Sequence, residues 1–342
     1  MARNDIVIVI VPGGMGSTLT LDGRVVWNFE LTLPPDVSGL HMIFNPALLL
    51  PWLPLRAGRL LSVYDDFLAF LGSQAYSQQQ QNLFLFPFDW RQGMKVAAEA
   101  LANFVKTKVI PNLAGRKILF IAHSYGTMVT RWALTVGAAA PLIDPNHVER
   151  VVAAGAYMLG IVPAFRNMVE MPNLNSIFND LFALLKTADP ALAAQVQAPL
   201  SRSLMAVTAQ LESLATFPIL QGGINPPPGQ PYRAFDWSGW PAELASLMGA
   251  VQQNLQNLAN APWPNVPRTV FASGNHPTDI GYVLDLNDQI QSHSVAPGDG
   301  VVLLQSALAY CALGEEVTVS YQHEELLNDP VARQFLVSQN VI

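Results

Sequence analysis

The sequence predicts an α/β protein in which a mostly parallel sheet is covered by helices on both faces. Short, continuously apolar strands alternate with helical segments in the first half of the chain, and the same pattern resumes after residue 265. Continuous apolar strands are typical of parallel sheets, which are buried on both faces. Residues 161–265 differ, because prolines and polar loops interrupt helical patterns there. We expect this stretch to form a large inserted helical cap.

The core is therefore expected to consist of residues 1–160 and 266–342. Its strands are predicted where apolar runs are bounded by turn-forming residues, at 6–11, 83–88, 117–122, 148–154, 268–272 and 317–321. Helices are predicted between and after them at 94–109, 126–136, 301–313 and 324–338. Within the cap, helical patterns cover 175–187, 190–198, 202–215 and 242–260.

Composition excludes several classes of protein. Of the 342 residues 51% are hydrophobic and 13% are charged, which argues against intrinsic disorder. The formal net charge of −7 argues against a nucleic-acid partner, because phosphate binding requires a basic face. Cys311 is the only cysteine, so neither a disulfide within the chain nor a cysteine-based zinc site can form. We expect no metal and no organic cofactor.

No targeting segment or membrane span is recognisable. The apolar run Ile6–Val11 stops at Pro12-Gly13-Gly14 and is too short for the core of a signal peptide. The uncharged stretch 151–165 is shorter than the roughly 20 residues that a span requires, and it contains Pro163. We expect a cytoplasmic location if the chain is complete.

A candidate nucleophile, Ser124, lies between a predicted strand and a predicted helix. The segment Ala122–Gly126 reads Ala-His-Ser-Tyr-Gly. This matches the G-x-S-x-G turn that exposes a serine hydroxyl above a sheet, with alanine in place of the first glycine. Such a serine needs a base, and the base needs an orienting carboxylate. An ordinary strand-to-helix turn that contains serine is the alternative.

Four histidines follow Ser124 in the chain, namely His147, His276, His293 and His323. His323 is the preferred base, because it directly follows a predicted strand and loops at strand ends carry functional residues. We expect His276 and His293 to be ordinary loop histidines.

Asp299 is the preferred carboxylate, because Gly298 and Gly300 give its loop the freedom to bend. A simple Asp-Gly turn is the alternative for this loop. Asp279, Asp285 and Asp288 are competing candidates for the same role.

Two backbone N–H groups are needed to stabilise an oxyanion. One is expected from Tyr125, which follows the nucleophile, and the other from the glycine loop Pro12–Gly16 after the first strand. That loop lacks the Gly-Lys-Ser/Thr ending of a phosphate-binding loop, so nucleotide binding is not expected.

Taken in order, these motifs resemble the lecithin:cholesterol acyltransferase family, which includes a lysosomal phospholipase and bacterial relatives. The matching segments span nearly the whole chain and are 11–17, Phe88-Asp89-Trp90-Arg91, 122–126 with Arg131, 298–302 and 323–328. The resemblance implies an α/β-hydrolase with Ser124, Asp299 and His323 as its catalytic triad. It further implies that the backbones of Gly14 and Tyr125 donate to the oxyanion, and that the substrate is an acyl ester of a lipid.

The chain departs from the family pattern at three positions. Gly14 stands where members often carry an acidic or polar residue, and Val301 replaces a threonine. Because Cys311 is alone, the early disulfide that ties down a membrane-binding loop in secreted members cannot form.

Met15 and Trp52 are the candidate substrate contacts. The apolar stretches 42–44 and 48–53 lie where the family has its membrane-docking region. They are open to three interpretations: packing of the cap, a wall of the pocket, or transient contact with a lipid surface. The Leu-, Phe-, Ile- and Pro-rich cap favours an apolar acyl group over a charged one. Trp90 and Arg91 are predicted to hold the sheet edge, with the guanidinium paired to a structural carboxylate.

We therefore predict a serine hydrolase that cleaves carboxylic esters with an apolar acyl group through an acyl-enzyme. Three alternatives stay open. The acyl group could pass to an alcohol instead of water, the substrate could be a lactone or amide, or a hydrolase-fold protein could bind an apolar ligand without turnover.

Overall fold

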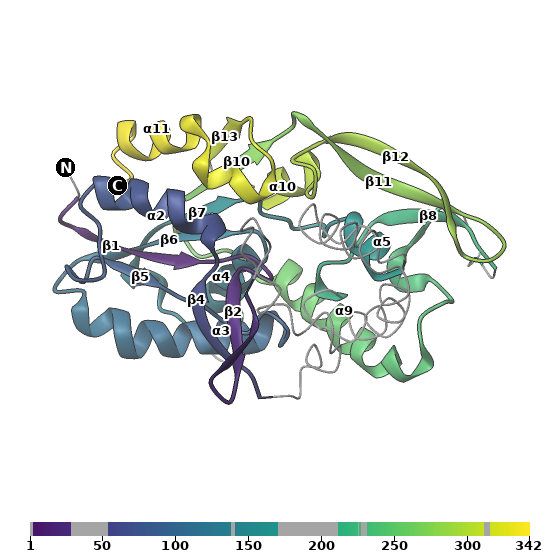
Figure 1. The fold of residues 1–342 in the computed structure, drawn as a ribbon, viewed down its shortest axis with the longest axis horizontal. Helices are drawn as coiled ribbons and strands as arrows, with labels where there is room; N and C mark the ends of the chain where they lie inside the picture. Colours follow the sequence, from purple (N-terminus) through teal and green to yellow (C-terminus); the bar gives the residue numbers. More distant parts are fainter. Residues whose placement is uncertain are drawn as a thin grey trace.

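The computed structural model describes residues 3–28, 54–137, 141–169, 211–224, 226, 231–310 and 315–342. Its core is a six-stranded sheet with the order β13-β10-β7-β6-β1-β5, and every neighbouring pair is parallel (Figure 1). The strands are β1 (Ile6–Val11), β5 (Leu83–Leu85), β6 (Lys117–His123), β7 (Val148–Ala154), β10 (Arg268–Ser273) and β13 (Glu315–Val319). The predicted parallel sheet is confirmed.

The central strands are buried on both faces, and β1 shows how their sequences achieve this. Val7, Val9 and Val11 pack into one hydrophobic cluster with α3 (Met94–Phe104) and α4 (Tyr125–Thr135). The alternate residues Ile6, Ile8 and Ile10 pack into a second cluster with α2 (Asp65–Ser73) and α11 (Pro330–Ser338). Since successive side chains of a strand point to opposite faces, one run of six apolar residues supplies both cores.

Helix boundaries differ from the predicted ones for local reasons. The helix expected at 94–109 is α-helical only to Phe104 and continues as a π-helical turn, Val105–Val109, and a 3-10 turn, Ile110–Asn112. The helix expected at 324–338 divides into a 3-10 helix, His323–Asn328, and α11. Pro330 cannot continue a helix but suits a first turn, where the Asp329 side chain accepts the Val331 N–H at 2.7 Å.

The other short elements of the core follow the chain between these strands. They are the 3-10 helices Ser62–Tyr64 and Pro145–His147, and the helix α10 (Leu304–Tyr310), whereas α5 (Pro163–Val169) lies within the expected cap region. A three-stranded antiparallel sheet, which the sequence analysis did not predict, is formed by β2 (Ser17–Leu21), β3 (Arg24–Trp27) and β4 (Arg56–Leu60).

The cap region contains strands as well as helices. A second sheet has the order β12-β11-β8-β9, from β8 (Pro218–Gly222), β9 (Tyr232–Arg233), β11 (His276–Leu284) and β12 (Ile290–Gly298). The hairpin of β11 and β12 reaches out from the core segment 266–342 and pairs with β8 (Figure 1). The expectation of an all-helical cap confined to 161–265 missed these strands.

Helical structure in the expected cap region is described at its start, in α5, and in its second half. The helix expected at 242–260 is present as the 3-10 helix Ala242–Leu244 followed by α9 (Ala245–Asn260), after a further 3-10 turn at Ala234–Asp236. The helices expected at 175–187 and 190–198, and most of 202–215, lie outside the described residues. None of the helices that are described has the length and apolar character needed to cross a bilayer.

Backbone hydrogen bonds join the start of the expected cap region to a segment near its middle, 213–216. Ile161 N–H donates to the Ser213 carbonyl at 2.8 Å, and Thr216 N–H donates to the Leu159 carbonyl at 2.9 Å. Gly160 lies between them with a φ of +79°, and a Cβ there would approach the Leu214 carbonyl oxygen to 2.2 Å. This junction therefore requires glycine for both its backbone angle and its space.

We predict that Gly160→Ala lowers the free energy of unfolding by about 2–4 kcal/mol, because strain at a positive φ adds to a backbone overlap. Gly115→Ala is the matched control. Gly115 has a φ of +86° but open space around its Cβ position, so only about 1 kcal/mol should be lost. Urea unfolding of the two variants checks this, and equal losses would contradict the proposed close contact.

Candidate active site

Ser124 lies in a sharp turn between β6 and α4. Its φ of 50° and ψ of −124° belong to neither element and are unfavourable for a residue with a Cβ. The neighbouring strands hold the turn in place. Ser124 N–H donates to the Ala154 carbonyl at the end of β7, at 2.9 Å. Gly126 lies so close to β1 that a Cβ would come within 2.3 Å of the Pro12 carbonyl oxygen.

The structure brings Ser124, His323 and Asp299 into one hydrogen-bonded row. His323 Nε2 lies 2.8 Å from Ser124 Oγ, and His323 Nδ1 lies 2.8 Å from Asp299 Oδ2. A carboxylate can only accept, so Nδ1 carries the proton of the neutral ring and Nε2 is left to accept the serine proton. Three separate segments of sequence thus meet at the carboxyl edge of the sheet.

Backbone groups fix the acidic end of this row. Asp299 is 2% exposed, and its Oδ1 accepts the N–H groups of Val301 and Val302 at 3.0 and 2.6 Å. The Asp299 carbonyl accepts the His323 N–H at 3.0 Å. Both carboxylate oxygens are therefore occupied, and the loop that carries the acid is joined to the loop that carries the histidine.

The charges of the pair shift the pKa values of both groups. Burial alone would lower the pKa of His323, but the adjacent Asp299 charge and hydrogen bond raise it above its usual range. Burial alone would raise the pKa of Asp299, yet the charge of His323 and the hydrogen bonds from His323, Val302 and Val301 hold it below its usual range. The pair therefore favours a charged Asp299 beside a ring that readily accepts a proton.

Gly155 makes room for the His323 ring, and the sequence analysis did not identify it. It follows β7 with a φ of +59°, and a Cβ there would lie 2.6 Å from His323 Cε1. Its only signal in the sequence is a glycine directly after a predicted strand.

The glycine loop after β1 forms a tight turn beside Ser124. Gly16 N–H donates to the Gly13 carbonyl at 3.1 Å, and Met15 occupies the turn with a φ of 62°. Trp27 Nε1–H donates to the Met15 carbonyl at 3.0 Å. Gly14 is exposed, and its Cβ position lies 3.6 Å from Tyr125 Cβ. The backbones of Gly14 and Tyr125 thus lie next to each other, with Tyr125 at the α4 N-terminus, where N–H groups lack helical partners.

The competing histidines and acids make contacts outside the row. His276 and His293 lie on β11 and β12, so their expected placement in loops is wrong. His276 Nε2 contacts the Ser320 carbonyl at 2.8 Å, and His293 pairs with Asp279. The remaining acids bind backbone N–H groups: Asp285 accepts from the nearby Asn287 and Gln289, and Asp288 accepts from the distant Ile224.

The two substrate-contact candidates have different outcomes. Met15 is partly buried and packs against the core cluster of β1, α3 and α4. Trp52 and the apolar stretches 42–44 and 48–53 lie outside the described residues.

The predicted pairing of Arg91 with a structural carboxylate is confirmed. The guanidinium is fully buried and donates to both oxygens of Asp89, at 2.8 and 2.6 Å. Trp90 packs edge-on against Trp27 with ring centroids 5.4 Å apart. These residues follow the edge strand β5, where we expected them.

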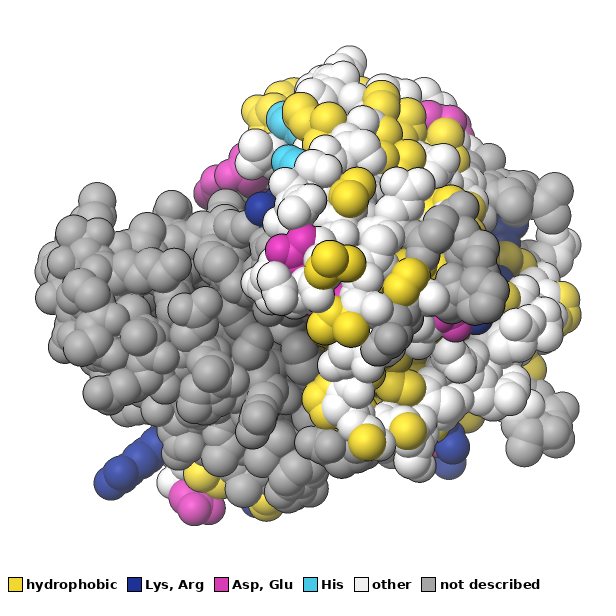
Figure 2. All heavy atoms as spheres, turned by 90° about the vertical axis from the view of Figure 1, so that its right-hand side faces the viewer, with side chains coloured by type: hydrophobic (Ala, Val, Ile, Leu, Met, Phe, Trp, Pro, Cys, Tyr) yellow, Lys and Arg dark blue, Asp and Glu magenta, His cyan; other side chains and the backbone are white. Residues whose placement is uncertain are grey.

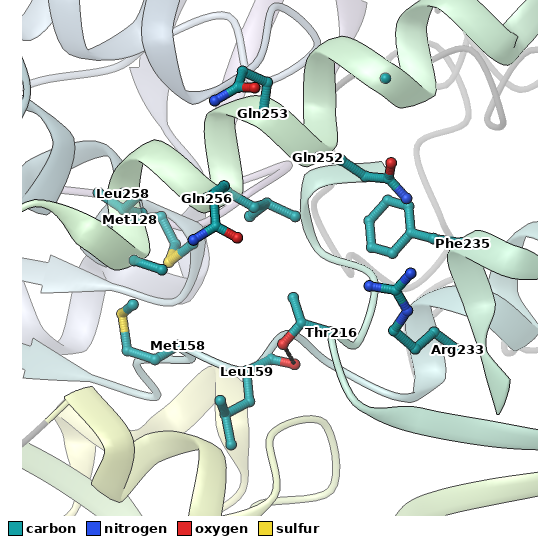
Figure 3. Close-up of a pocket in the computed structure, with 13 residues that line it drawn as sticks. Met128, Met158, Leu159, Thr216, Arg233, Phe235, Gln252, Gln253, Gln256 and Leu258 are labelled. Atoms are coloured by element: carbon teal, nitrogen blue, oxygen red, sulfur yellow. Dashed lines mark hydrogen bonds between the residues drawn. The ribbon is translucent and has the colours of Figure 1, made fainter. Parts of the chain in front are cut away.

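A pocket of about 540 Å³ lies between α9 and the loop that follows β7 (Figure 3). Met158 and Leu159 line one side, whereas Gln252 and Gln256 of α9 line the other, with Met128 beside Gln256 (Figure 3). Met128 lies on α4 one turn beyond Ser124, which is about 6 Å along the helix axis. The pocket thus has an apolar lining residue on the helix that begins at Ser124.

Charge is sparse at the cap end of the molecule. Figure 2 looks onto this end and shows few charged side chains among the described residues, with hydrophobic side chains scattered between uncharged ones. Within the same described residues, no group of three His, Cys, Asp or Glu side chains is arranged to hold a metal ion.

Comparison with known proteins finds a family that matches part of the chain and structures that share its fold. The sequence profile of the family described as Lecithin:cholesterol acyltransferase matches residues 52–184. The chain therefore resembles this family over those residues, and its fold is that of an α/β-hydrolase. A chain in the crystal structure of the Tle4-Tli4 complex superposes on it with a TM-score of 0.66 at 12% identity, covering 96% of each chain. Because the sequence identity is only 12%, this structural similarity shows a shared fold and nothing about function.

Weaker structural similarities are found to two bacterial proteins. The mature lipase BlEst2 of Bacillus licheniformis has a TM-score of 0.43 at 14% identity and covers 100% of this chain and 94% of its own. A lipase-esterase related protein from Clostridium acetobutylicum has a TM-score of 0.40 at 10% identity, with 99% and 96% covered. None of the curated protein sequences compared with this chain matches it.

We predict that Asp299→Asn lowers the pKa of His323, because burial then acts without the opposing charge. Titration of isotope-labelled histidine side chains by NMR measures this directly. Asp279→Asn is the matched control, since Asp279 contacts His293 and should leave the His323 titration unchanged. An unchanged His323 pKa in Asp299→Asn would contradict the pairing.

Proposed function

We propose that this α/β-hydrolase-fold protein is a serine esterase in which Ser124 is the nucleophile, His323 the general base and Asp299 the orienting acid. The observation that carries the proposal is the hydrogen-bonded row from Ser124 Oγ through His323 to Asp299, built on a strained strand-to-helix turn. A serine hydroxyl is a weak nucleophile unless a base removes its proton as it attacks. This row supplies that base within direct hydrogen-bond reach.

The reaction follows from the positions of these groups. Ser124 Oγ attacks the ester carbonyl carbon while His323 Nε2 takes the serine proton. The negative charge then on the carbonyl oxygen is stabilised by the N–H groups of Gly14 and Tyr125. As the tetrahedral intermediate collapses, the C–O bond to the alcohol breaks and His323 returns the proton to the leaving oxygen. A water molecule then attacks the acyl-enzyme while His323 takes its proton. The bond between the acyl carbon and Ser124 Oγ breaks, His323 returns the proton to Oγ, and the carboxylic acid leaves.

Each group contributes in a different way. Asp299 fixes the histidine tautomer and stabilises the imidazolium, which agrees with the raised pKa of His323 and the lowered pKa of Asp299. The two oxyanion donors act only once charge has developed, and losing one such donor typically costs about 10²- to 10³-fold in kcat. None of these steps calls on a metal or an organic cofactor.

The substrate proposed here is an ester with an apolar acyl group. The pocket beside α4 is lined in part by methionine and leucine side chains. One of its lining residues, Met128, lies one helical turn along α4 from the nucleophile Ser124. Amide side chains of α9 and the Arg233 guanidinium complete its lining, which suits a ligand with both an apolar part and hydrogen-bonding groups. A lipid or lipid-like ester has this composition.

Transfer of the acyl group to an alcohol is the second candidate function, because the matching family is described as an acyltransferase. Both reactions share the acyl-enzyme and differ only in the acceptor. Product analysis of an active preparation with and without a long-chain alcohol separates them. A new ester as the main product would favour transfer, and free acid under both conditions would favour hydrolysis.

We predict that a fluorophosphonate attaches once to the wild-type protein and not to Ser124→Ala, as read by intact mass. The reagent requires an activated serine and no knowledge of the substrate. Ser306→Ala is the matched control, since Ser306 is buried and bonds the Gly160 carbonyl, so labelling should persist. A folded wild type that stays unlabelled would contradict the esterase assignment and favour an apolar-ligand-binding protein.

A further inference from the structure

A chain of buried hydrogen bonds joins the glycine turn to the histidine loop behind the reacting groups. Gly13 N–H donates to Tyr64 Oη at 2.8 Å, and Tyr64 Oη lies 2.9 Å from His123 Nδ1. His123 Nε2 lies 2.8 Å from the carbonyl oxygen of His323. Tyr64, His123 and His323 are only 3, 6 and 5% exposed. We refer to Tyr64 and His123 as the relay pair.

The direction of each bond follows from the chemistry of its partners. The His323 carbonyl can only accept, so His123 Nε2 carries the proton. Burial lowers the pKa of His123 to about 3, so the ring is neutral at ordinary pH and its Nδ1 is an acceptor. Tyr64 therefore donates its only proton to His123, and its oxygen is left to accept the N–H of Gly13. Every polar atom of the relay pair has a single possible role.

The relay pair links the glycine turn, the Ser124 turn and the His323 loop. Gly13 directly precedes Gly14 in the glycine turn, and His123 directly precedes Ser124. His323 contributes its carbonyl to the relay pair and its ring to Ser124. The Tyr64 segment holds the turn at a second point, where Leu61 N–H donates to the Gly16 carbonyl at 3.0 Å.

Close packing leaves this arrangement little freedom. A Cβ at Gly16 would lie 3.0 Å from Tyr64 Oη, and a Cβ at Gly13 would lie 3.2 Å from His123 Nδ1 and 3.0 Å from Ser124 Cβ. The rings of Tyr64 and His123 meet edge-on at 5.8 Å, and those of His123 and His323 lie 5.0 Å apart. A shift of any one segment would therefore be transmitted to the other two.

We propose that Tyr64 and His123 are positioning residues that hold the oxyanion turn and the base loop at fixed distances from Ser124. Neither side chain reaches the substrate in this role. The Gly13 N–H is bound by Tyr64, which orients the turn so that the following N–H, that of Gly14, lies free beside Tyr125. The His323 carbonyl is bound by His123, which sets how far the histidine backbone stands from the nucleophile.

This inference rests on the proposed esterase function. It implies that loss of the relay pair changes the kinetics of the folded enzyme, whereas loss of a purely stabilising network would not. Misplacement of catalytic groups by about 1 Å can cost about 10²-fold in rate. A defect in positioning should reduce stabilisation of the transition state while substrate binding is retained. A defect in stability alone should leave kcat unchanged in the folded protein.

The test uses Tyr64→Phe, with Tyr76→Phe as the matched control. Tyr76 is 1% exposed, and its hydroxyl accepts one backbone N–H, that of Arg3, at 3.1 Å. For each variant kcat and KM are measured on a p-nitrophenyl ester, together with inhibition by an alkylboronic acid, which forms a tetrahedral adduct on serine. Urea unfolding is measured in parallel.

We expect Tyr64→Phe to lower kcat about 10- to 100-fold with KM within about twofold, and to weaken boronic acid binding by a similar factor. Tyr76→Phe should retain kcat and boronic acid binding even where its stability falls. Normal kcat and normal boronic acid binding in Tyr64→Phe, with only a loss of stability, would overturn the inference while leaving the esterase function intact. A wild type without turnover or labelling would overturn both.

A second pair of variants keeps the test decisive if Tyr64→Phe does not fold. In His123→Gln the side-chain amide can still donate toward the His323 carbonyl, whereas in His123→Leu both hydrogen bonds are lost. We expect kcat to fall less in the glutamine variant than in the leucine variant, with KM unchanged in both. Equal, near-normal kcat values in the two variants would overturn the positioning role.

Discussion

The strand-to-helix turn at Ser124 is the constraint on which the rest of the site depends. A φ of 50° is tolerated there only because neighbouring backbone over-determines it. Gly126 lies against the carbonyl groups at the end of β1, and Ser124 N–H is bound at the end of β7. These two strands flank β6 in the sheet. The order of the parallel strands therefore determines how the serine hydroxyl is presented. The glycine turn after β1 and Gly155 after β7 are placed beside Ser124 by the same strands.

Burial of an acid and a histidine next to this turn would be costly if either stood alone. Removing a carboxylate from water carries a large free-energy penalty unless it is paired and hydrogen-bonded. Asp299 meets that requirement through His323 and two backbone N–H groups, and the loop geometry that provides them also joins the acid loop to the histidine loop. Donors that are already oriented need no reorganisation when charge develops on a substrate. The relay pair extends the same principle to the far side of the nucleophile.

The parts predictable from sequence were those with a local signal. Buried parallel strands such as Ile6–Val11 are continuous apolar runs. Ser124 and His323 stand at predicted strand ends, and Asp299 stands in a loop between two glycines. The hairpin of β11 and β12 was missed because most of its residues are at least partly exposed and it contains two prolines, so no periodic apolar pattern marks it. Tyr64 was missed for another reason: its contact with His123 spans 59 residues of sequence, and a lone tyrosine in a short 3-10 helix carries no signal. Long-range polar contacts become visible only once the chain is folded.

A crystal structure of the protein after reaction with an alkyl fluorophosphonate tests the central claim most directly, since the adduct resembles the tetrahedral intermediate. We expect one phosphonyl group on Ser124 Oγ, with its non-bridging oxygen about 2.7–3.1 Å from the N–H nitrogens of Gly14 and Tyr125. The Gly13 N–H should remain bound to Tyr64, and the alkyl chain should enter the pocket beside Met128. A phosphonyl oxygen turned away from both N–H groups would contradict the proposed oxyanion donors. An adduct on a residue other than Ser124 would contradict the proposed nucleophile.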